Sequence, residues 1–301
     1  MGENPAVPGR DKKDHEVWFK SLRIGGWAAV IAFVAVAITG DIQAKLMYEQ
    51  QPMKMASAEA ACSDGTSFSV LTIGIPDSNH CDDTKTLIEV PGLLSFLVHS
   101  NFTEEVPGVK TLLPEYEEKF GGVIPDDPMY RDYAGQKIDY QPLMIVTYWG
   151  FRFMIGFGAL AAIFAGYALF ATRKGTVPKS KFLAHLSLWG IAAPFVADSA
   201  GWVFTEMGRQ PFVVAPNMGA DGVDGVMLYT AAAISPSVSA GAMLFSLVAL
   251  TLLYGGLMVV ELILIIKYAR GGVAAAMPEL DTSGSKPSAE HEDDDVLSFA
   301  Y

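Results

Sequence analysis

The chain has 301 residues, of which 51% are hydrophobic and only 18% are charged, and its net charge is −12. A soluble domain carries about a quarter charged residues, and binding to phosphate requires a basic surface. The composition therefore favours a membrane protein and argues against nucleic acid as a partner. The hydrophobic residues also fall into long runs, as a lipid bilayer requires.

Four apolar runs predict an all-α, integral membrane helical bundle. A helix needs about 20 residues to cross the hydrocarbon core, and transmembrane helices are expected at 24–48, 143–172, 182–206 and 231–268. The first run is short and follows basic residues, so a secretory signal peptide is the alternative there. Acidic residues before the run and the lack of a small-residue cleavage site favour a retained helix.

Lysine and arginine residues flank these runs in a pattern that predicts their orientation. Basic residues mark the cytoplasmic side of a membrane protein, and here they gather in the segments 1–23, 173–181 and just after the fourth run. The segments 49–142 and 207–230 are then expected outside the plasma membrane. The tail, 269–301, is rich in acids, Ser, Gly and Pro, which predicts a disordered cytoplasmic segment.

The segment 49–142 is rich in polar and turn-forming residues and predicts a mostly irregular extracytoplasmic loop, with short helices near 93–99 and 113–120. A loop this long without its own core is usually functional. Cys62 and Cys81 both lie in it. A disulfide is permitted outside the cell, and two free thiols are the alternative.

Ionisable residues within apolar runs are expensive in a membrane and are treated as candidate sites. Arg152 interrupts the second run, and two residues later comes Met154, whose thioether can ligate heme iron. Ordinary packing is the alternative for a membrane methionine. The nearby arginine favours heme, because the heme propionates need a cation at that depth.

The third run ends in Asp198, Trp202 and Glu206, which are spaced four residues apart and share one helical face. A structural polar network between helices is one interpretation. The other is a cofactor pocket, with Glu206 as ligand or proton acceptor, Trp202 stacked on a ring and Arg209 pairing with a carboxylate.

A third group of polar residues lies where the first helix leaves the membrane. Gln51, Lys54 and Glu59 have the chemistry to bind a quinol headgroup and accept its protons, although composition alone favours an ordinary solvated helix end. Glu261, deep in the fourth run, either pairs with a neighbouring helix or lines a proton path. No histidine lies in the middle of a run, so no heme ligand is assigned to any of the five.

Several stretches together resemble subunit I of the cytochrome bd family of quinol oxidases, over about residues 15–270. Residues 201–211 read GWVFTEMGRQP and residues 151–154 read FRFM. Gly40-Asp41, followed by QPMKMA at 51–56 and Glu59, resembles the quinol-binding loop of the family, and SFSV with GIP at 67–76 supports the match. One departure is Phe212, which stands where the family's motif ends in tryptophan and therefore lacks the N–H donor.

The resemblance implies roles for these residues. Met154 matches the axial ligand of the low-spin heme b iron, with Arg152 beside that heme. Glu206 matches the ligand of the high-spin heme b iron, with Trp202 between the hemes and Arg209 in the same motif. Lys54, Glu59 and the neighbouring Gln51 match the residues of quinol oxidation.

The resemblance also implies cofactors, partners and a reaction. The hemes are b558, b595 and d, and the substrate is ubiquinol or menaquinol, which the enzyme oxidises while it reduces dioxygen to water and builds a proton gradient without pumping. The family's amino-terminal half, which carries the missing histidine ligands, is expected as a separate partner chain, together with subunit II. This chain is expected to be inactive alone.

The alternative is a heme-free or degenerate paralogous membrane subunit with a structural or assembly role. The presence of Met154, Glu206, Lys54 and Glu59 argues against it.

Overall fold

The computed structural model describes residues 12–75, 81, 84–128, 130, 133–175, 181–216, 227–233, 235 and 237–271. They fall into two compact units. The larger unit lies within residues 19–245 and contains nearly all the candidate site residues. The smaller consists, among the described residues, of 12–18 and 246–271. The predicted acidic tail, 269–301, lies almost wholly outside the described residues.

Four long helices dominate the described residues: α1 (Lys12–Gln50), α5 (Met144–Ala171), α6 (Lys181–Gly208) and α7 (Ala240–Gly271). Three stretches, Glu16–Gln50, Met144–Ala171 and Ala240–Gly271, are long and apolar enough to cross a membrane. α6 is as long as α5, but the side chains of residues 181–186 and 188 lie outside the described residues, so this comparison does not cover its full length. Three of the four predicted spans therefore have this property, and a membrane crossing by α6 stays a prediction.

The helix ends differ from the predicted bounds at two places. α1 begins at Lys12 rather than at residue 24, so the helix continues through the basic flank. α7 begins at Ala240 rather than at residue 231, because Thr230–Ala232 form a separate 3₁₀ turn, η2. The Ser239 hydroxyl accepts the backbone N–H of Ala242 at 3.2 Å, and this cap sets the start of α7.

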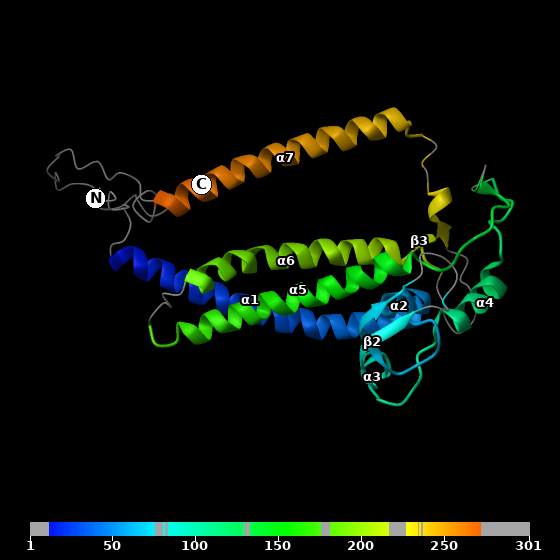
Figure 1. The fold of residues 1–301 in the computed structure, drawn as a ribbon. Coiled ribbons are helices and arrows are strands. Elements are labelled where there is room, and N and C mark those ends of the chain that lie inside the picture. The colour runs from blue at the N-terminus through cyan, green and yellow to red at the C-terminus, as the bar shows by residue number, and fades with distance from the viewer. Residues whose placement is uncertain are drawn as a thin grey trace, which may run out of the picture. The chain divides into compact units, whose positions relative to one another are not determined.

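Helices α5 and α6 pack along each other in the larger unit (Figure 1). Glycines allow the close approach: a Cβ at Gly150 would lie 3.2 Å from the Ala200 carbonyl oxygen, and one at Gly190 would lie 2.8 Å from the Phe164 ring. Small residues have the same role in other membrane helix pairs, where they let the helix backbones meet.

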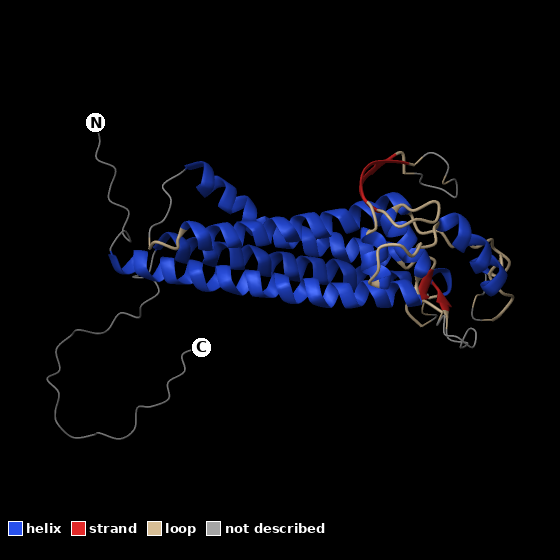
Figure 2. Ribbon diagram, turned by 90° about the horizontal axis from the view of Figure 1, so that it is seen from below, coloured by secondary structure: helices blue, strands red, loops and turns tan. Residues whose placement is uncertain are grey.

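The segment 49–142, called the outer segment after its predicted location, is more ordered than its composition predicts. It contains α2 (Pro52–Glu59), β1 (Phe68–Ile73), β2 (Lys85–Val90), α3 (Leu93–His99) and α4 (Val109–Phe120). β1 and β2 form an antiparallel pair, as do β3 (Phe212–Val214) and β4 (Leu228–Tyr229). The short elements gather at one end of the long helices of the larger unit (Figure 2). The all-α prediction is therefore correct for the long helices but missed both sheets.

An aromatic core holds this outer region together. Tyr116, Phe120, Tyr140, Phe212 and Tyr229 are all buried and their rings contact one another. The Tyr140 hydroxyl donates to the Gly121 carbonyl at 2.7 Å and lies 3.2 Å from the Tyr229 hydroxyl. Because these residues come from both sides of α5 and α6 in the sequence, the core joins the segment 49–142 to the segment that follows α6.

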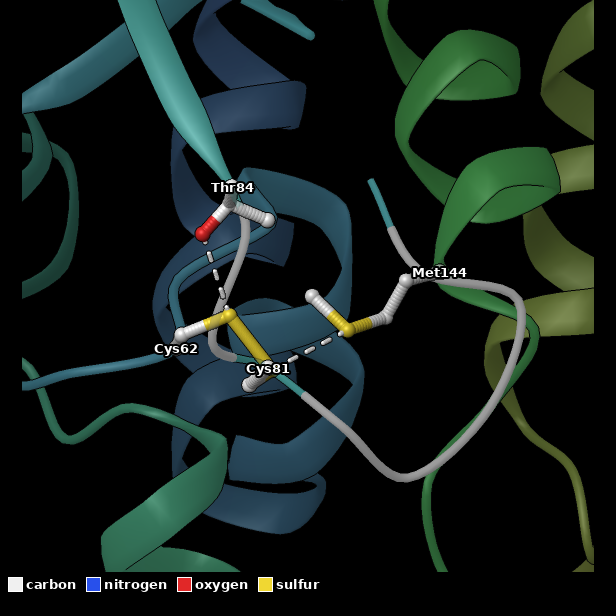
Figure 3. The surroundings of a disulfide bond; sticks show 4 residues. All are labelled: Cys62, Cys81, Thr84 and Met144. Atoms are coloured by element: carbon white, nitrogen blue, oxygen red, sulfur yellow. Dashed lines mark hydrogen bonds between the residues drawn. A yellow bond between two sulfur atoms is a disulfide. The ribbon is translucent and has the colours of Figure 1, made fainter. Parts of the chain in front are cut away.

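A disulfide joins Cys62 and Cys81 (Figure 3), whose Cα atoms are 5.2 Å apart. Both cysteines are buried, and Thr84 and Met144 contact the sulfur atoms. The bond ties the end of α2 to the connection between β1 and β2, beside the start of α5. Of the two possibilities that the sequence left open, the structure contains the disulfide.

The Cys62→Ser substitution is expected to loosen the outer segment. A disulfide closing a loop of this length contributes about 3 kcal/mol through the restricted unfolded chain. Limited proteolysis of the segment 49–142 should be faster in the variant and in the wild type after reduction. Equal cleavage rates before and after reduction would contradict this.

The start of α4 depends on a glycine. A Cβ at Gly108 would lie 2.5 Å from the carbonyl carbon of Ser63, whereas one at Gly122 would meet nothing within 4 Å. The Asp64 carboxylate accepts the Gly108 N–H and the Thr111 hydroxyl, both at 2.8 Å. This contact places α4 directly against the chain that follows α2.

Gly108→Ala is expected to destabilise the outer segment by about 1–3 kcal/mol, the usual cost of overpacking. Gly122→Ala is the matched control at the other end of α4, with an expected change within about 0.5 kcal/mol. Thermal unfolding of the two variants should separate them, and equal melting temperatures would count against the close backbone contact.

Candidate quinol and heme site

Two site residues that lie far apart in the sequence form an ion pair. Arg152, in α5, donates from Nη2 to Oε2 of Glu59, at the end of α2, at 2.7 Å. The Glu59 side chain is buried and that of Arg152 is nearly so, with 2% and 9% exposed. The outer segment and the helix that carries Met154 are therefore joined by a charged contact out of reach of solvent.

Aromatic rings and a strand enclose this ion pair. The guanidinium carbon of Arg152 lies 4.3 Å from the centre of the Phe68 ring and 4.5 Å from that of Tyr148, within the range of cation–π attraction. Ser69 of β1 accepts Arg152 Nε at its carbonyl at 2.7 Å. Oε1 of Glu59 and Nη1 of Arg152 are buried with no hydrogen-bond partner among the described residues. These two atoms are therefore available to a group from outside the described chain.

Burial raises the pKa of the Glu59 carboxyl above its ordinary value, although the charge of Arg152 and the hydrogen bonds from Arg152 and Ser69 oppose the shift. Desolvation penalises the charged form of a carboxyl group. A carboxyl group with a raised pKa can both accept and release a proton closer to neutral pH than an ordinary glutamate.

Lys54 lies on another side of α2 and faces the end of α6. Its Nζ donates to the Thr205 carbonyl at 3.4 Å and lies 5.1 Å from the centre of the Phe204 ring. The stem rests on Gly208, where a Cβ would come within 3.0 Å of Cγ of Lys54. Burial lowers the pKa of Lys54, the charge of Arg209 lowers it further, and Glu206 opposes the shift.

Glu206 and Arg209 pair with each other at the end of α6 through Oε2 and Nη2. The pair is less buried than Glu59 and Arg152, with 41% of Glu206 and 35% of Arg209 exposed. Beside it, Gln51, Lys54 and Arg209 line a pocket of about 20 Å³ with Tyr116 and Tyr140. This is room for about one water molecule.

Met154 turns toward α6. A Cβ at Gly201 would lie 3.0 Å from Sδ of Met154, so the glycine leaves room for the thioether. Trp202 is 64% exposed and Asp198 is also exposed. Since Asp198, Trp202 and Glu206 share one face of α6, this face is not covered by the described residues of the larger unit.

The structure thus forms two groups on opposite sides of α2. One joins Glu59 to Arg152, and the other joins Lys54 and Gln51 to Glu206 and Arg209. Glu59 is the fifth residue after Lys54, which turns their side chains well apart around a helix with 3.6 residues per turn.

Other residues that the sequence singled out lie outside both groups. Asp41 pairs with Lys45 one turn further along α1, at 2.7 Å. Glu261 is exposed on α7. The side chains of four of the histidines, His15, His80, His185 and His291, lie outside the described residues, and His99 lies in α3 against Tyr48.

Comparison with known proteins identifies the family of the chain. The profile described as "Cytochrome bd terminal oxidase subunit I" matches residues 7–273. The chain belongs to this family.

The chain is also similar in sequence to named members of this family. The chain is 32% identical over 243 residues to "Cytochrome bd ubiquinol oxidase subunit 1" of Bacillus subtilis, which covers 81% of the chain and 47% of that protein. It is 24% identical over 311 residues to "Cytochrome bd-II ubiquinol oxidase subunit 1" of Escherichia coli, covering 90% and 58%. A "Putative cytochrome bd menaquinol oxidase subunit I" of Bacillus subtilis is 28% identical over 197 residues, covering 64% and 37%. The chain spans about half the length of these relatives.

Membership of the cytochrome bd family and the apolar helices together show a membrane-embedded protein. They also confirm the family that the sequence motifs predicted. The roles of the individual site residues remain predictions.

The described residues include side chains that could donate to a heme iron. Among the described residues no group of three or more His, Cys, Asp or Glu side chains could hold a metal ion. A heme iron needs only axial donors from the protein, and a methionine thioether can serve as one of them. Met154, with space kept for its sulfur by Gly201, and the partly exposed Glu206 are side chains of the kind that can serve as axial donors.

Two residues near the ion pair had no predicted role. Ser69 hydrogen-bonds to both Glu59 and Arg152, and the buried Tyr148 holds the same strand against α5. The spacing of Tyr148 and Arg152, four residues apart in a helix, indicates that they share a face. Ser69 lies in the SFSV stretch that supports the family resemblance, but the sequence does not reveal its contacts, because they depend on how β1 folds back onto α2.

Proposed function

We propose that this chain is part of a cytochrome bd-type quinol:oxygen oxidoreductase. The buried ion pair between Glu59 and Arg152 is the observation that carries the proposal. It connects the segment expected to bind quinol with the helix expected to bind heme. A structural subunit without redox chemistry has no evident need for a buried charge pair that leaves one carboxylate oxygen and one guanidinium nitrogen without partners.

In this proposal quinol binds at the outer end of the helices, where Gln51 and Lys54 lie beside the small pocket. Lys54 can hold the headgroup oxygen by a hydrogen bond. Glu59, on the other side of α2, is the acceptor of a proton relayed from the headgroup by water, because its raised pKa suits repeated uptake and release. The protons leave on the outer side, and those that form water enter from the cytoplasm, so the reaction builds a proton gradient without a pump.

The hemes of the family supply one-electron transfer and the reduction of dioxygen when they are bound. Met154 would hold the iron of heme b558, with Arg152 nearby as a cation. Glu206 would hold the iron of heme b595, with Trp202 and Arg209 beside it. Heme d would be shared with the remainder of the enzyme.

The proposed enzyme has further chains. The uncovered face of α6, with Asp198 and Trp202, fits a surface completed by the amino-terminal half of subunit I, and subunit II is the other partner. The chain would cross the plasma membrane four times, including α6, with the segment 49–142 outside and the tail in the cytoplasm. The substrate would be ubiquinol or menaquinol.

Oxygen uptake tests the proposal. The complex purified through this chain should consume oxygen when a short-chain ubiquinol or menaquinol is added. Lys54→Gln should raise the KM for quinol while the complex stays intact, because it removes a headgroup contact. A purified complex without quinol-dependent oxygen uptake would contradict the proposed function.

The rate of quinol oxidation should depend on pH through Glu59. Only the ionised carboxylate accepts a proton, so the rate should rise with pH through the pKa of Glu59. Since burial raises that pKa, the acidic limb should lie above the value of about 4.3 for an ordinary glutamate. Profiles of kcat against pH in wild type and Glu59→Gln provide the measurement, and an identical limb in both would exclude Glu59 as its source.

A further inference from the structure

Ser69 contacts both members of the buried ion pair. Its backbone N–H donates to Oε2 of Glu59 at 3.2 Å, and its hydroxyl donates to the Glu59 carbonyl at 2.6 Å. In the other direction, its carbonyl accepts Nε of Arg152 at 2.7 Å and its hydroxyl accepts Nη2 at 3.2 Å. The residue is itself buried, with 6% exposed. Each of its polar groups therefore contacts Glu59 or Arg152.

The strand that carries Ser69 is fixed against α5. Ser69 and Thr72 are the buried residues of β1. The Tyr148 hydroxyl accepts the N–H of Thr72 at 2.9 Å and donates to the Ser69 carbonyl at 3.3 Å. Since Tyr148 is fully buried, Ser69 is held from the α5 side while it holds the end of α2 on the other.

These contacts distinguish the two oxygens of the Glu59 carboxylate. Oε2 accepts Nη2 of Arg152 and the N–H of Ser69. Oε1 is buried and accepts nothing among the described residues. An ionised carboxylate has lone pairs on both oxygens, so the one with free lone pairs is Oε1.

We propose that Ser69 is a positioning residue of the quinol site, which fixes Glu59 against Arg152 so that Oε1 is the atom that accepts the proton. The inference rests on the proposed function. In this step the quinol O–H bond breaks, the proton is relayed by water around α2, and an O–H bond forms on Oε1, while the bonding electron pair stays on the quinol oxygen. Ser69 touches neither the quinol nor the hemes in this scheme.

Ser69→Ala tests the proposal in the assembled complex. The variant removes the hydroxyl but keeps the backbone contacts, so Arg152 and the end of α2 each lose a hydrogen bond. Loss of hydrogen bonds to charged groups is expected to lower kcat about tenfold, with a change in KM of less than about twofold. The hydroxyl also donates to Oε2 of Glu59 at 3.4 Å, and this hydrogen bond lowers the pKa of Glu59, so the acidic limb of the kcat profile should move to higher pH in the variant.

A second readout does not depend on turnover. The infrared carbonyl band of the protonated Glu59 carboxyl, identified by its loss in Glu59→Gln, should titrate at higher pH in Ser69→Ala than in wild type. Ser69→Thr retains the hydroxyl and should restore both the rate and the titration.

Ser57→Ala is the matched control. Ser57 is a fully buried serine in α2, and its hydroxyl has no hydrogen-bond partner among the described residues. The variant should leave kcat, the pH profile and the infrared titration unchanged.

The outcomes separate the inference from the proposed function. An active wild-type complex in which Ser69→Ala keeps the wild-type kcat, pH profile and infrared titration would overturn the role of Ser69 alone. A loss of rate in Ser69→Ala that Ser69→Thr fails to restore, with an unshifted titration, would also overturn it. A wild-type complex without quinol oxidation would overturn the proposed function and this inference together.

Discussion

Replacing Arg152 with methionine is expected to destabilise the protein by about 3–5 kcal/mol, the usual cost of removing one partner from a buried ion pair. Glu59, with 2% of its side chain exposed, would keep a charge out of reach of water and lose its strongest donor. The flexible methionine side chain fills part of the space between the Phe68 and Tyr148 rings. The lost stability therefore reflects mainly the unpaired carboxylate.

The penalty should depend on pH in a defined direction. Arg152 lowers the pKa of Glu59, so the substitution raises that pKa further above the value in the unfolded chain. A folded state that binds the proton more tightly than the unfolded state loses stability as pH rises between the two pKa values. The penalty should be smallest in acid and complete above the pKa of Glu59 in the folded variant.

Thermal unfolding of the detergent-solubilised complex across this pH range provides the measurement. The double variant Arg152→Met/Glu59→Gln should recover much of the stability, because replacing both members of a buried pair is far less costly than replacing one. Additive effects of the two substitutions would contradict a direct interaction. Both variants should still fail to oxidise quinol at the wild-type rate.

Replacing Met154 with leucine is expected to remove the low-spin heme signal and nearly all quinol oxidation. The substitution changes the side-chain volume little and should cost less than about 1.5 kcal/mol in stability. It removes the thioether sulfur, which lies beside Gly201. If that sulfur is an axial ligand, the loss of activity should exceed the 10- to 100-fold effect typical of changes around a metal ligand.

Met144→Leu is the control for this prediction. Met144 lies in the same helix and is fully buried, and its sulfur contacts the disulfide rather than α6. The Met144→Leu variant should retain the low-spin heme signal and the quinol oxidation activity. Loss of the heme signal in both variants, or in neither, would remove Met154 from the heme site.

The long helices could be predicted from the sequence because a bilayer imposes one simple requirement, an apolar run of sufficient length. The prediction for α6 is the one that the described residues do not test, because part of that helix has no described side chains. The ends of α1 and α7 were less predictable. They depend on local contacts such as the Ser239 cap, which hydropathy does not reveal.

The residues of the candidate site could be predicted from the sequence, but the contacts between them could not. Family motifs marked Lys54, Glu59, Arg152 and Glu206, which the structure brings together in two groups. The pairing of Glu59 with Arg152 crosses 93 positions of sequence, and it requires α2 and β1 to fold onto the outer end of α5. A local sequence pattern cannot predict a contact between residues so far apart in the chain.

The pairing of Cys62 with Cys81 shows the same limit. The sequence allowed a disulfide, and only the fold brings their Cα atoms to 5.2 Å. The β1–β2 hairpin was missed for a related reason, because every residue of β2 is exposed and no alternation of buried and exposed positions marks it.

Reduced-minus-oxidised optical spectra of this chain, purified alone and in its complex, test the central claim most directly. The claim is that the chain provides the quinol loop and one side of each heme pocket, with the opposite ligands on another chain. The complex should show a low-spin heme b signal that quinol reduces, and the isolated chain should show none that is stable. A stable low-spin heme b with two protein ligands in the isolated chain, or a complex without heme, would contradict the account.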